Sequence, residues 1–181
     1  MSRRIYLVLF MLGMVMALGT ASLQDLPGYL DSDYYFVGGL QLVEGKGFSE
    51  PFLWNYLDNP AGLPHPSHTY WYPLSSILAA VSMFLTGQHT YVAARLIFIL
   101  IAACIPPLTA ALAFDVTGNR ALALTSGLLA VFPVYYLPFM PVTDNYGSFM
   151  LLGGSILLLA KKDDRWSFLL MGLLAVMSSL S

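Results

Sequence analysis

Long apolar runs, separated by short polar breaks, occupy most of this chain. A helix needs about 20 apolar residues, rising 1.5 Å each, to cross about 30 Å of hydrocarbon. Each run of roughly that length is expected to form a transmembrane helix, and these runs cover residues 5–22, 91–114, 121–140, 145–160 and 166–181. The pattern predicts an all-α, polytopic membrane protein.

A further apolar run, residues 73–87, reaches only about 22 Å as a helix. If it crosses the bilayer, the basic residues after it lie opposite those at the amino terminus. If it stays in the interface, all of them share the cytoplasmic side, as the positive-inside rule expects. The basic residues concerned are Arg3, Arg4, Arg120, Lys161, Lys162 and Arg165. We therefore expect an interfacial helix over 73–87, inside an extracytoplasmic loop covering residues 23–90.

The same loop contains a second predicted interfacial helix, over residues 34–44. Phe36, Leu40 and Val43 recur at helical spacing and form the apolar stripe that such a helix requires. Gly45 and Gly47 follow, where a left-handed backbone ends a helix. The loop therefore holds two short helices at the membrane surface.

Composition supports a membrane protein. The chain is 57% hydrophobic and 10% charged, whereas soluble domains carry about 25% charged residues. A net charge of -2 gives no basis for binding nucleic acid. The single cysteine, Cys104, lies in an apolar run and excludes a disulfide framework or a CxxC metal site.

The first apolar run has a second interpretation. Two arginines, an apolar core and the small residues 19–21 resemble a secretory signal peptide with its cleavage site. The later apolar runs favour a retained first helix, because a polytopic protein rarely needs its first span removed.

Acidic side chains of the loop are the first candidates for chemistry. Asp31 and Asp33 lie just before the expected helix start at Tyr34, where a carboxylate can cap free backbone N–H groups. Capping accounts for only one of them, so a catalytic or metal-binding role is the alternative for both. The carboxylates between residues 23 and 72 are Asp25, Asp31, Asp33, Glu44, Glu50 and Asp58.

Basic and aromatic residues supply further candidates. Arg95 lies inside a predicted span, where a charge is costly and points to function. Its guanidinium suits phosphate oxygens, although it can instead snorkel to the interface or pair with a loop carboxylate. His65 and His68 lie close together in "HPSH". If Arg95 binds a phosphate group, the two histidines are candidates for additional hydrogen-bond donors to it; otherwise they are ordinary polar loop residues. Tyr70 and Trp71 either anchor the loop among headgroups or stack on a sugar.

Three segments carry a resemblance to a known superfamily. They are the acid and tyrosine pair before "GLQLVEGKGF", the stretch "HPSHTYWYPLSSILAAVSMFLTG" with the span after it, and "PVTDNYGSFMLLGGSILLLA". Together they resemble GT-C-type membrane glycosyltransferases, which include protein O-mannosyltransferases, aminoarabinose transferases and oligosaccharyltransferase catalytic subunits. The likeness covers nearly all 181 residues, but its motifs are single acids and aromatic–proline patterns.

The resemblance implies an inverting sugar transfer from a polyprenyl-phosphate-linked donor at the extracytoplasmic face of the cell membrane. By position, Asp31 matches the first-loop acid and would be the general base. Asp144 matches the second-loop acid, which orients the acceptor or ligates Mg²⁺ or Mn²⁺ with Asp31 or Asp33. Some branches of the superfamily use a metal and others do not, so the resemblance leaves the cofactor open.

The implied partners are the lipid-linked donor, a glycan, lipid or protein acceptor, and the bilayer itself. The chain resembles the amino-terminal part of such a transferase, and we expect these residues alone to be inactive. Two alternatives stay open: a transporter fragment, with Arg95 and Asp144 as a buried relay, and a non-catalytic membrane assembly subunit. Transporter charges gather near the bilayer midplane, whereas the acids here lie in a long loop.

Overall fold

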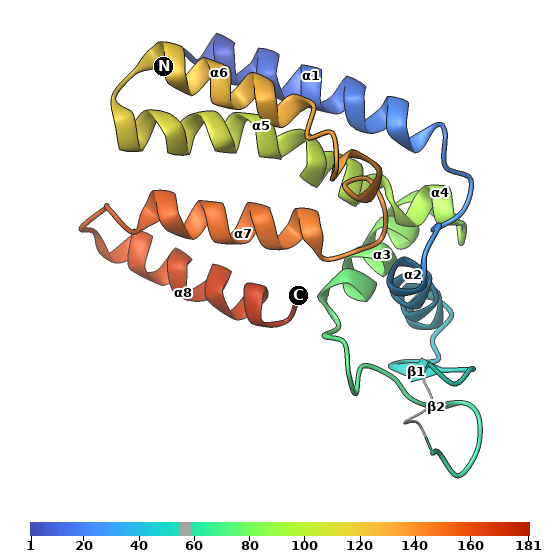
Figure 1. Ribbon diagram of the computed structural model, residues 1–181. Coiled ribbons are helices and arrows are strands. Elements are labelled where there is room, and N and C mark those ends of the chain that lie inside the picture. The colour runs from blue at the N-terminus through green and yellow to red at the C-terminus, as the bar shows by residue number, and fades with distance from the viewer. Residues whose placement is uncertain (55–58) are drawn as a thin grey trace.

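The computed structural model describes residues 1–54 and 59–181, which are mostly helical (Figure 1). One group of helices runs side by side as a bundle: α1 (Arg3–Ala21), α5 (Leu96–Thr117), α6 (Arg120–Val131), α7 (Tyr146–Leu159) and α8 (Arg165–Ser179). A second group gathers at one end of the bundle: α2 (Leu30–Val43), α3 (Leu74–Thr86), α4 (Tyr91–Ala94) and an antiparallel pair, β1 (Ser49–Glu50) and β2 (His65–Pro66). A short 3₁₀ turn, η1 (Leu137–Phe139), lies between α6 and α7.

In the part of the chain that the structure describes, two helical stretches are long and apolar enough to cross a bilayer by length and composition. They are α1 and the continuous pair α4–α5, from Tyr91 to Thr117. Helices α6, α7 and α8 are apolar but have only 12, 14 and 15 residues. The all-α class is therefore confirmed, while the expectation of five full-length spans stays a prediction.

The expected helix over residues 121–140 is wrong in its second half. Helix α6 ends at Val131, because Pro133 lacks an N–H donor and disfavours helical backbone at Phe132. An irregular segment containing η1 then leads to α7. Pro106 and Pro107, by contrast, lie within α5 without ending it.

Helix α5 is the centre of the bundle, with α1, α6 and α7 packed on it. Glycines permit the close approach of each partner. A Cβ built at Gly13 of α1 would lie 3.1 Å from the Ala103 carbonyl oxygen, and one at Gly127 of α6 would lie 2.9 Å from the Ala110 Cβ. One at Gly154 of α7 would lie 2.7 Å from a Leu108 methyl carbon. Small residues at such contacts are typical of helix packing in membranes.

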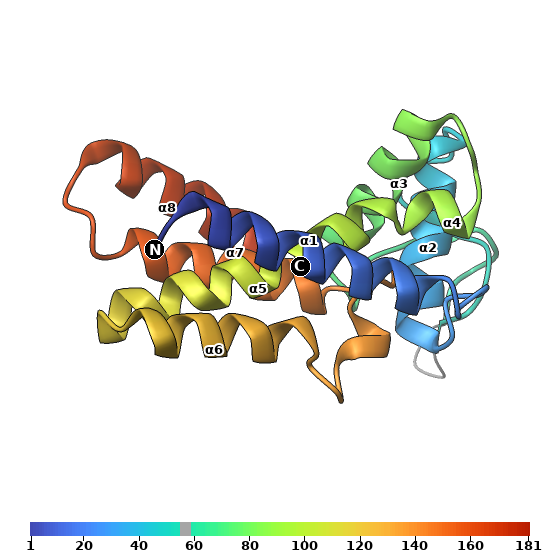
Figure 2. The ribbon, with the colours of Figure 1, turned by 90° about the horizontal axis from the view of Figure 1, so that it is seen from above.

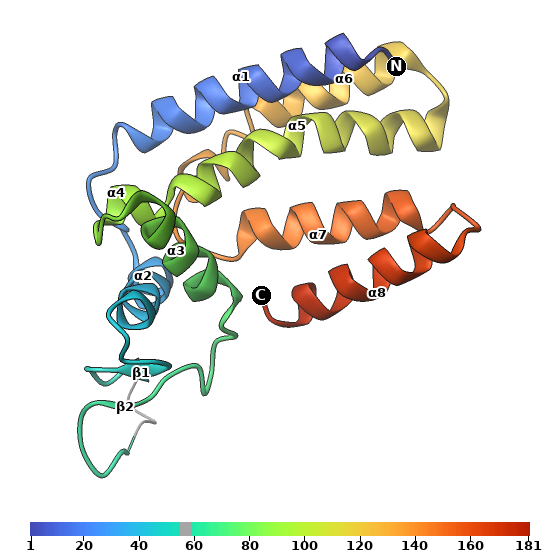
Figure 3. The same ribbon diagram turned by 180° about the vertical axis from the view of Figure 1, so that it is seen from behind.

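The two ends of the bundle differ in charge. The amino terminus, the α5–α6 turn and the α7–α8 turn meet at one end (Figures 1 and 3). This end contains every Lys and Arg of the chain except Lys46 and Arg95. An ion pair between Lys161 Nζ and Asp115 Oδ2, at 2.8 Å, joins the α7–α8 turn to the last turn of α5.

Helices α2 and α3 lie across the opposite end of the bundle (Figure 2). The expected helix over 73–87 is confirmed as α3, and it does not run alongside α1 and α5. Helix α2 begins at Leu30, one turn before the expected start. Gly45 and Gly47 have the predicted left-handed backbone, with φ of 75° and 68°.

The apolar stripe of α2 has a different role from the one expected. Phe36, Leu40 and Val43 pack against a buried cluster that includes Ala79 and Met83 of α3. The stripe is therefore partly covered by protein, and it joins α2 to α3 as one layer.

Candidate functional site

Two segments far apart in the sequence are joined at the start of α2. The Thr143 hydroxyl donates to the Ser32 carbonyl oxygen at 2.8 Å, and the two hydroxyl oxygens lie 2.9 Å apart. Both residues are fully buried. The first turn of α2 is thereby docked on the residues that precede α7, so the two predicted loop acids, Asp31 and Asp144, lie at the same end of the bundle.

Asp144 is 3% exposed, and both of its carboxylate oxygens are occupied. The Tyr29 hydroxyl donates to Oδ2, and the Asn145 backbone N–H donates to Oδ1 at 2.5 Å. Burial raises the pKa of Asp144 above its usual value; the two hydrogen bonds oppose this shift, and the charge of Asp31 adds to it. Each carboxylate oxygen of Asp144 therefore accepts a hydrogen bond, and these bonds fix the position of the side chain.

Asp31 has a different environment from Asp144. It lies in the first turn of α2 and is half-buried, and within the described residues its side chain makes no hydrogen bond. Partial burial raises its pKa. The charges of Asp31 and Asp144 both raise the pKa of Tyr29 and of the buried Tyr35, after the larger effect of burial itself. Tyr29, Asp31, Tyr35 and Asp144 thus form one site, which we call the acidic site.

Capping, the structural alternative for Asp31 and Asp33, is not what the structure shows. The N-cap residue of α2 is Tyr29, and among the described residues no side chain makes a capping hydrogen bond at this end. Both acids lie in the first turn, where the helix dipole favours negative charge. Asp33 is exposed and, like Asp31, has a pKa raised by partial burial.

The structure adds no support for the expected metal site. Within residues 1–54 and 59–181, no three Asp, Glu, His or Cys side chains are grouped so that they could hold an ion. Asp144 already accepts two hydrogen bonds, which leaves Asp31 as the less encumbered carboxylate. A metal site shared by Asp31, Asp33 and Asp144 stays a prediction. Asp58, a further loop acid, lies outside the described residues.

Arg95 lies between α4 and α5 and is buried, with 6% of its surface exposed. Its Nη1 donates to the Gln24 carbonyl oxygen at 2.5 Å, and its guanidinium carbon lies 5.0 Å from the centre of the Tyr91 ring. In this structure Arg95 holds the α1–α2 connection against α4, rather than presenting its charge at an open surface.

The two histidines have separate surroundings. His65 Nε2 lies 3.1 Å from Glu50 Oε1 and 3.1 Å from the Phe52 carbonyl oxygen, so it joins the two strands of the hairpin. His68 has a left-handed backbone with φ of 60°, and its N–H donates to the Tyr34 hydroxyl at 2.6 Å. Its Nδ1 lies 3.1 Å from the Trp71 carbonyl oxygen, and its buried Nε2 has no partner in the described chain. Burial lowers the pKa of His68.

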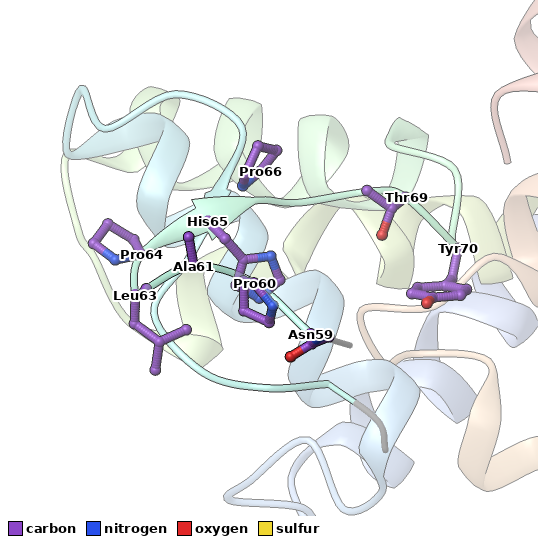
Figure 4. A pocket seen from close by; sticks show the side chains of 10 residues that line it. Asn59, Pro60, Ala61, Leu63, Pro64, His65, Pro66, Thr69 and Tyr70 are labelled. Carbon is purple, nitrogen blue, oxygen red and sulfur yellow. The ribbon is translucent and has the colours of Figure 1, made fainter. Parts of the chain in front are cut away.

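Tyr70 and Trp71 are 47% and 38% exposed. Tyr70, with Asn59, His65 and Thr69, lines an open pocket of about 750 Å³ between the 59–66 segment and residues 69–70 (Figure 4). Neither Asp31 nor Asp144 lines this pocket. The structure therefore brings Asp31 and Asp144 together but does not bring His65 or Tyr70 to them.

Sequence reasoning missed Tyr29, Ser32 and Thr143. Tyr29 contributes the hydrogen bond to Asp144, and its ring packs edge-on against Phe139 with 5.5 Å between centres. Hydroxyl residues directly beside each predicted acid, in "YLDS" and "VTD", were the available signal. Comparison of the chain with protein-family models, curated proteins and solved structures finds no match.

Proposed function

We propose that this chain forms part of a membrane glycosyltransferase that moves a sugar from a polyprenyl-phosphate-linked donor to an acceptor at the extracytoplasmic face. The observation that carries the proposal is the pairing of Asp31 with Asp144 at the end of the bundle opposite the basic residues. Asp31 is half-buried and makes no side-chain hydrogen bond within residues 1–54 and 59–181, whereas Asp144 is buried and held by hydrogen bonds. Paired carboxylates in unlike environments are typical of acid–base chemistry.

The charge distribution supports the orientation in the membrane. Under the positive-inside rule, the end with Arg3, Arg4, Arg120, Lys161, Lys162 and Arg165 is cytoplasmic. The acidic site then faces the extracytoplasmic side, and α2 and α3 lie along the membrane surface. A lipid-linked donor presents its sugar at that surface.

Asp31 is the proposed general base. A base must reach the acceptor, and Asp31 is half-exposed while Asp144 is not. Its raised pKa brings it closer to the working pH, which favours proton transfer. Asp31 takes the proton of the acceptor hydroxyl as its oxygen bonds to the anomeric carbon. The bond from that carbon to the phosphate oxygen breaks on the opposite face, so the configuration inverts.

Asp144 and Arg95 have supporting roles in the proposal. Asp144 raises the pKa of Tyr29 and accepts a hydrogen bond from its hydroxyl, and Tyr29 lies two residues before Asp31 in the sequence. Arg95 would have to exchange the Gln24 carbonyl for a phosphate oxygen to stabilise the leaving group. Otherwise it is a positioning residue for the α1–α2 connection.

Substitution of Asp31 tests the proposal. Asp31→Asn keeps the side-chain shape but removes the base, so transfer from a radiolabelled polyprenyl phosphate sugar should fall by about 10²–10⁴-fold. The complete protein that contains this chain is assayed in its native membranes, with expression measured in parallel. Asp25→Asn, at an exposed acid of the same loop, is the matched control and should retain transfer. Unchanged transfer by Asp31→Asn at normal expression removes the assignment of the base.

A further inference from the structure

A shallow groove lies between α1 and α6. The two helices are parallel, since both run away from the end of the bundle that holds the basic residues, and each packs mainly on α5 (Figures 1 and 3). They meet at Gly127, where an added Cβ would lie 2.7 Å from a Leu9 methyl carbon. A cavity of about 170 Å³ occupies the groove, and its lining consists of Arg4, Ile5, Val8, Leu9, Leu124 and Leu128.

The walls of the groove are apolar side chains that the rest of the chain leaves uncovered. Val8 is 56% exposed, and Leu128 on the opposite wall is 46% exposed. Leu128 is eight residues beyond Arg120, where α6 begins, which places it about 12 Å from that end of the helix. In the proposed orientation the groove therefore opens into the cytoplasmic half of about 30 Å of hydrocarbon.

Arginines stand at the cytoplasmic end of this apolar lining. Arg4 is the charged residue that lines the cavity. It precedes Leu9 by five positions on α1, or about 7.5 Å. Arg120 precedes Gly127 by seven positions on α6, or about 10.5 Å, so the two arginines lie at nearly the same depth on neighbouring helices.

The positive charge at this end of the groove has no partner within the described chain. The side chains of Arg3, Arg4 and Arg120 make no ion pair or hydrogen bond with residues 1–54 or 59–181, and the first turns of α1 and α6 contain no acidic residue. Asp115, at the same end of the bundle, pairs with Lys161 instead. A negative group from outside the protein would therefore offset charge that the fold leaves unneutralised.

We propose that the groove binds an anionic phospholipid of the cytoplasmic leaflet, with its phosphate at Arg4 and one acyl chain between Val8 and Leu128. Charge complementarity selects this occupant: the walls suit a hydrocarbon chain, and the unpaired arginines suit a negative headgroup at the surface end of that chain. A zwitterionic lipid supplies the chain without net charge, and free phosphate supplies the charge without the chain. The inference goes beyond the proposed function and does not depend on sugar transfer.

Site-resolved photolabelling with two lipids tests the proposal. The complete protein that contains this chain is reconstituted in phosphatidylcholine nanodiscs with a small fraction of phosphatidylglycerol that carries a diazirine on its acyl chain. Labelled peptides should include residues 5–9 and 124–128. A phosphatidylcholine with the same diazirine should label these peptides at least about fivefold less, because one basic residue at a membrane surface favours an anionic lipid by about that factor.

Variants on both parts of the groove separate charge from shape. Arg4→Gln should lower the phosphatidylglycerol label about fivefold, whereas Arg4→Lys should retain most of it. Lys162→Gln is the matched control, because it removes the same charge at the same end of the bundle but outside the groove. If Arg4→Gln does not insert, Leu128→Phe tests the apolar wall: it should fill the groove and lower the label from both lipids. Leu129→Phe, at a 70% exposed position outside the cavity, should not.

The remaining outcomes are equally decisive. Equal labelling by the two lipids, or full labelling of an Arg4→Gln variant that inserts normally, overturns the proposal. Loss of the label on addition of glycerol 3-phosphate at the same concentration as the lipid would indicate a site for free phosphate and also overturns it. Absence of label from both lipids would show that protein covers the groove, which contradicts a lipid occupant. Selective groove labelling in a protein that transfers no sugar supports this site and contradicts only the proposed function.

Discussion

The hydrogen bond from Tyr29 to Asp144 is the contact whose removal tests the acidic site most directly. Tyr29→Phe deletes one hydroxyl and retains the ring, which packs against Phe139. Asp144 is almost fully buried, so the lost donor is not replaced by bulk water. Its carboxylate then keeps only the Asn145 N–H among its present partners.

The expected effect depends on the charge of Asp144. A hydrogen bond to a charged group contributes about 1.5–3 kcal/mol, and a neutral one about 0.5–1.5 kcal/mol. Burial already raises the pKa of Asp144, so the folded state binds this proton more tightly than the unfolded state does. Stability therefore falls as pH rises through the folded-state pKa. Because Tyr29 opposes that shift, Tyr29→Phe should raise the pKa further and lower the free energy of unfolding most at neutral pH.

Equilibrium unfolding in mixed micelles across a pH series measures this effect. The loss for Tyr29→Phe should be about 1.5–3 kcal/mol near neutral pH and should shrink in acid as Asp144 becomes protonated. Tyr135→Phe is the control, because Tyr135 is 75% exposed and its hydroxyl donates to nothing in the described residues. Equal unfolding free energies for Tyr29→Phe and the wild type at all pH values would refute the proposed role of this bond.

Three further predictions follow from the packing and the charge distribution. Gly39→Ala should lower the free energy of unfolding by about 1–3 kcal/mol, because its Cβ would lie 2.8 Å from the Ala79 Cβ. Gly153→Ala is the control and should not destabilise the protein, because the space around Gly153 is open. Equal stability of the two variants would contradict the close packing of α2 on α3. Because burial lowers the pKa of His68, the segment around His68 should lose stability as pH falls below about 6.5. Asparagine tolerates the left-handed backbone, so His68→Asn should abolish this pH dependence of hydrogen exchange. An unchanged pH profile in His68→Asn would contradict the role of His68. Two single-cysteine variants, Leu63→Cys and Asp163→Cys, are made in a chain without Cys104. In intact cells, an impermeant thiol reagent should label the cysteine at position 63 but not the one at position 163. The reverse pattern would contradict the proposed orientation in the membrane.

Helix positions were largely predictable from apolar periodicity, because run length and spacing are local properties. Helices α1, α3 and α5 begin and end within a few residues of the predicted bounds. The error in α6 has a local cause as well: Pro133 ends the helix, although Pro106 and Pro107 do not end α5. A proline's effect depends on what can satisfy the freed carbonyl groups, and that depends on neighbouring helices.

The acidic site was predictable only in part. Charge asymmetry and the short 73–87 run indicated that Asp31 and Asp144 share one end, and the Ser32–Thr143 contact agrees with this. The Tyr29–Asp144 and Thr143–Ser32 hydrogen bonds were not predictable, because each joins residues over a hundred positions apart in the chain. The same limit applies to Arg95, whose partner is a backbone carbonyl that no side-chain pattern reveals.

The unequal helix lengths have a consequence for the surrounding lipid. In the proposed orientation, α1 spans about 28 Å, whereas α6 and α7 span only about 18 and 21 Å. The bundle is therefore uneven in its hydrophobic thickness, and a bilayer matches it by thinning around α6 and α7. The free energy of unfolding should therefore be higher in bilayers of short-chain lipids than in thick, sterol-rich ones.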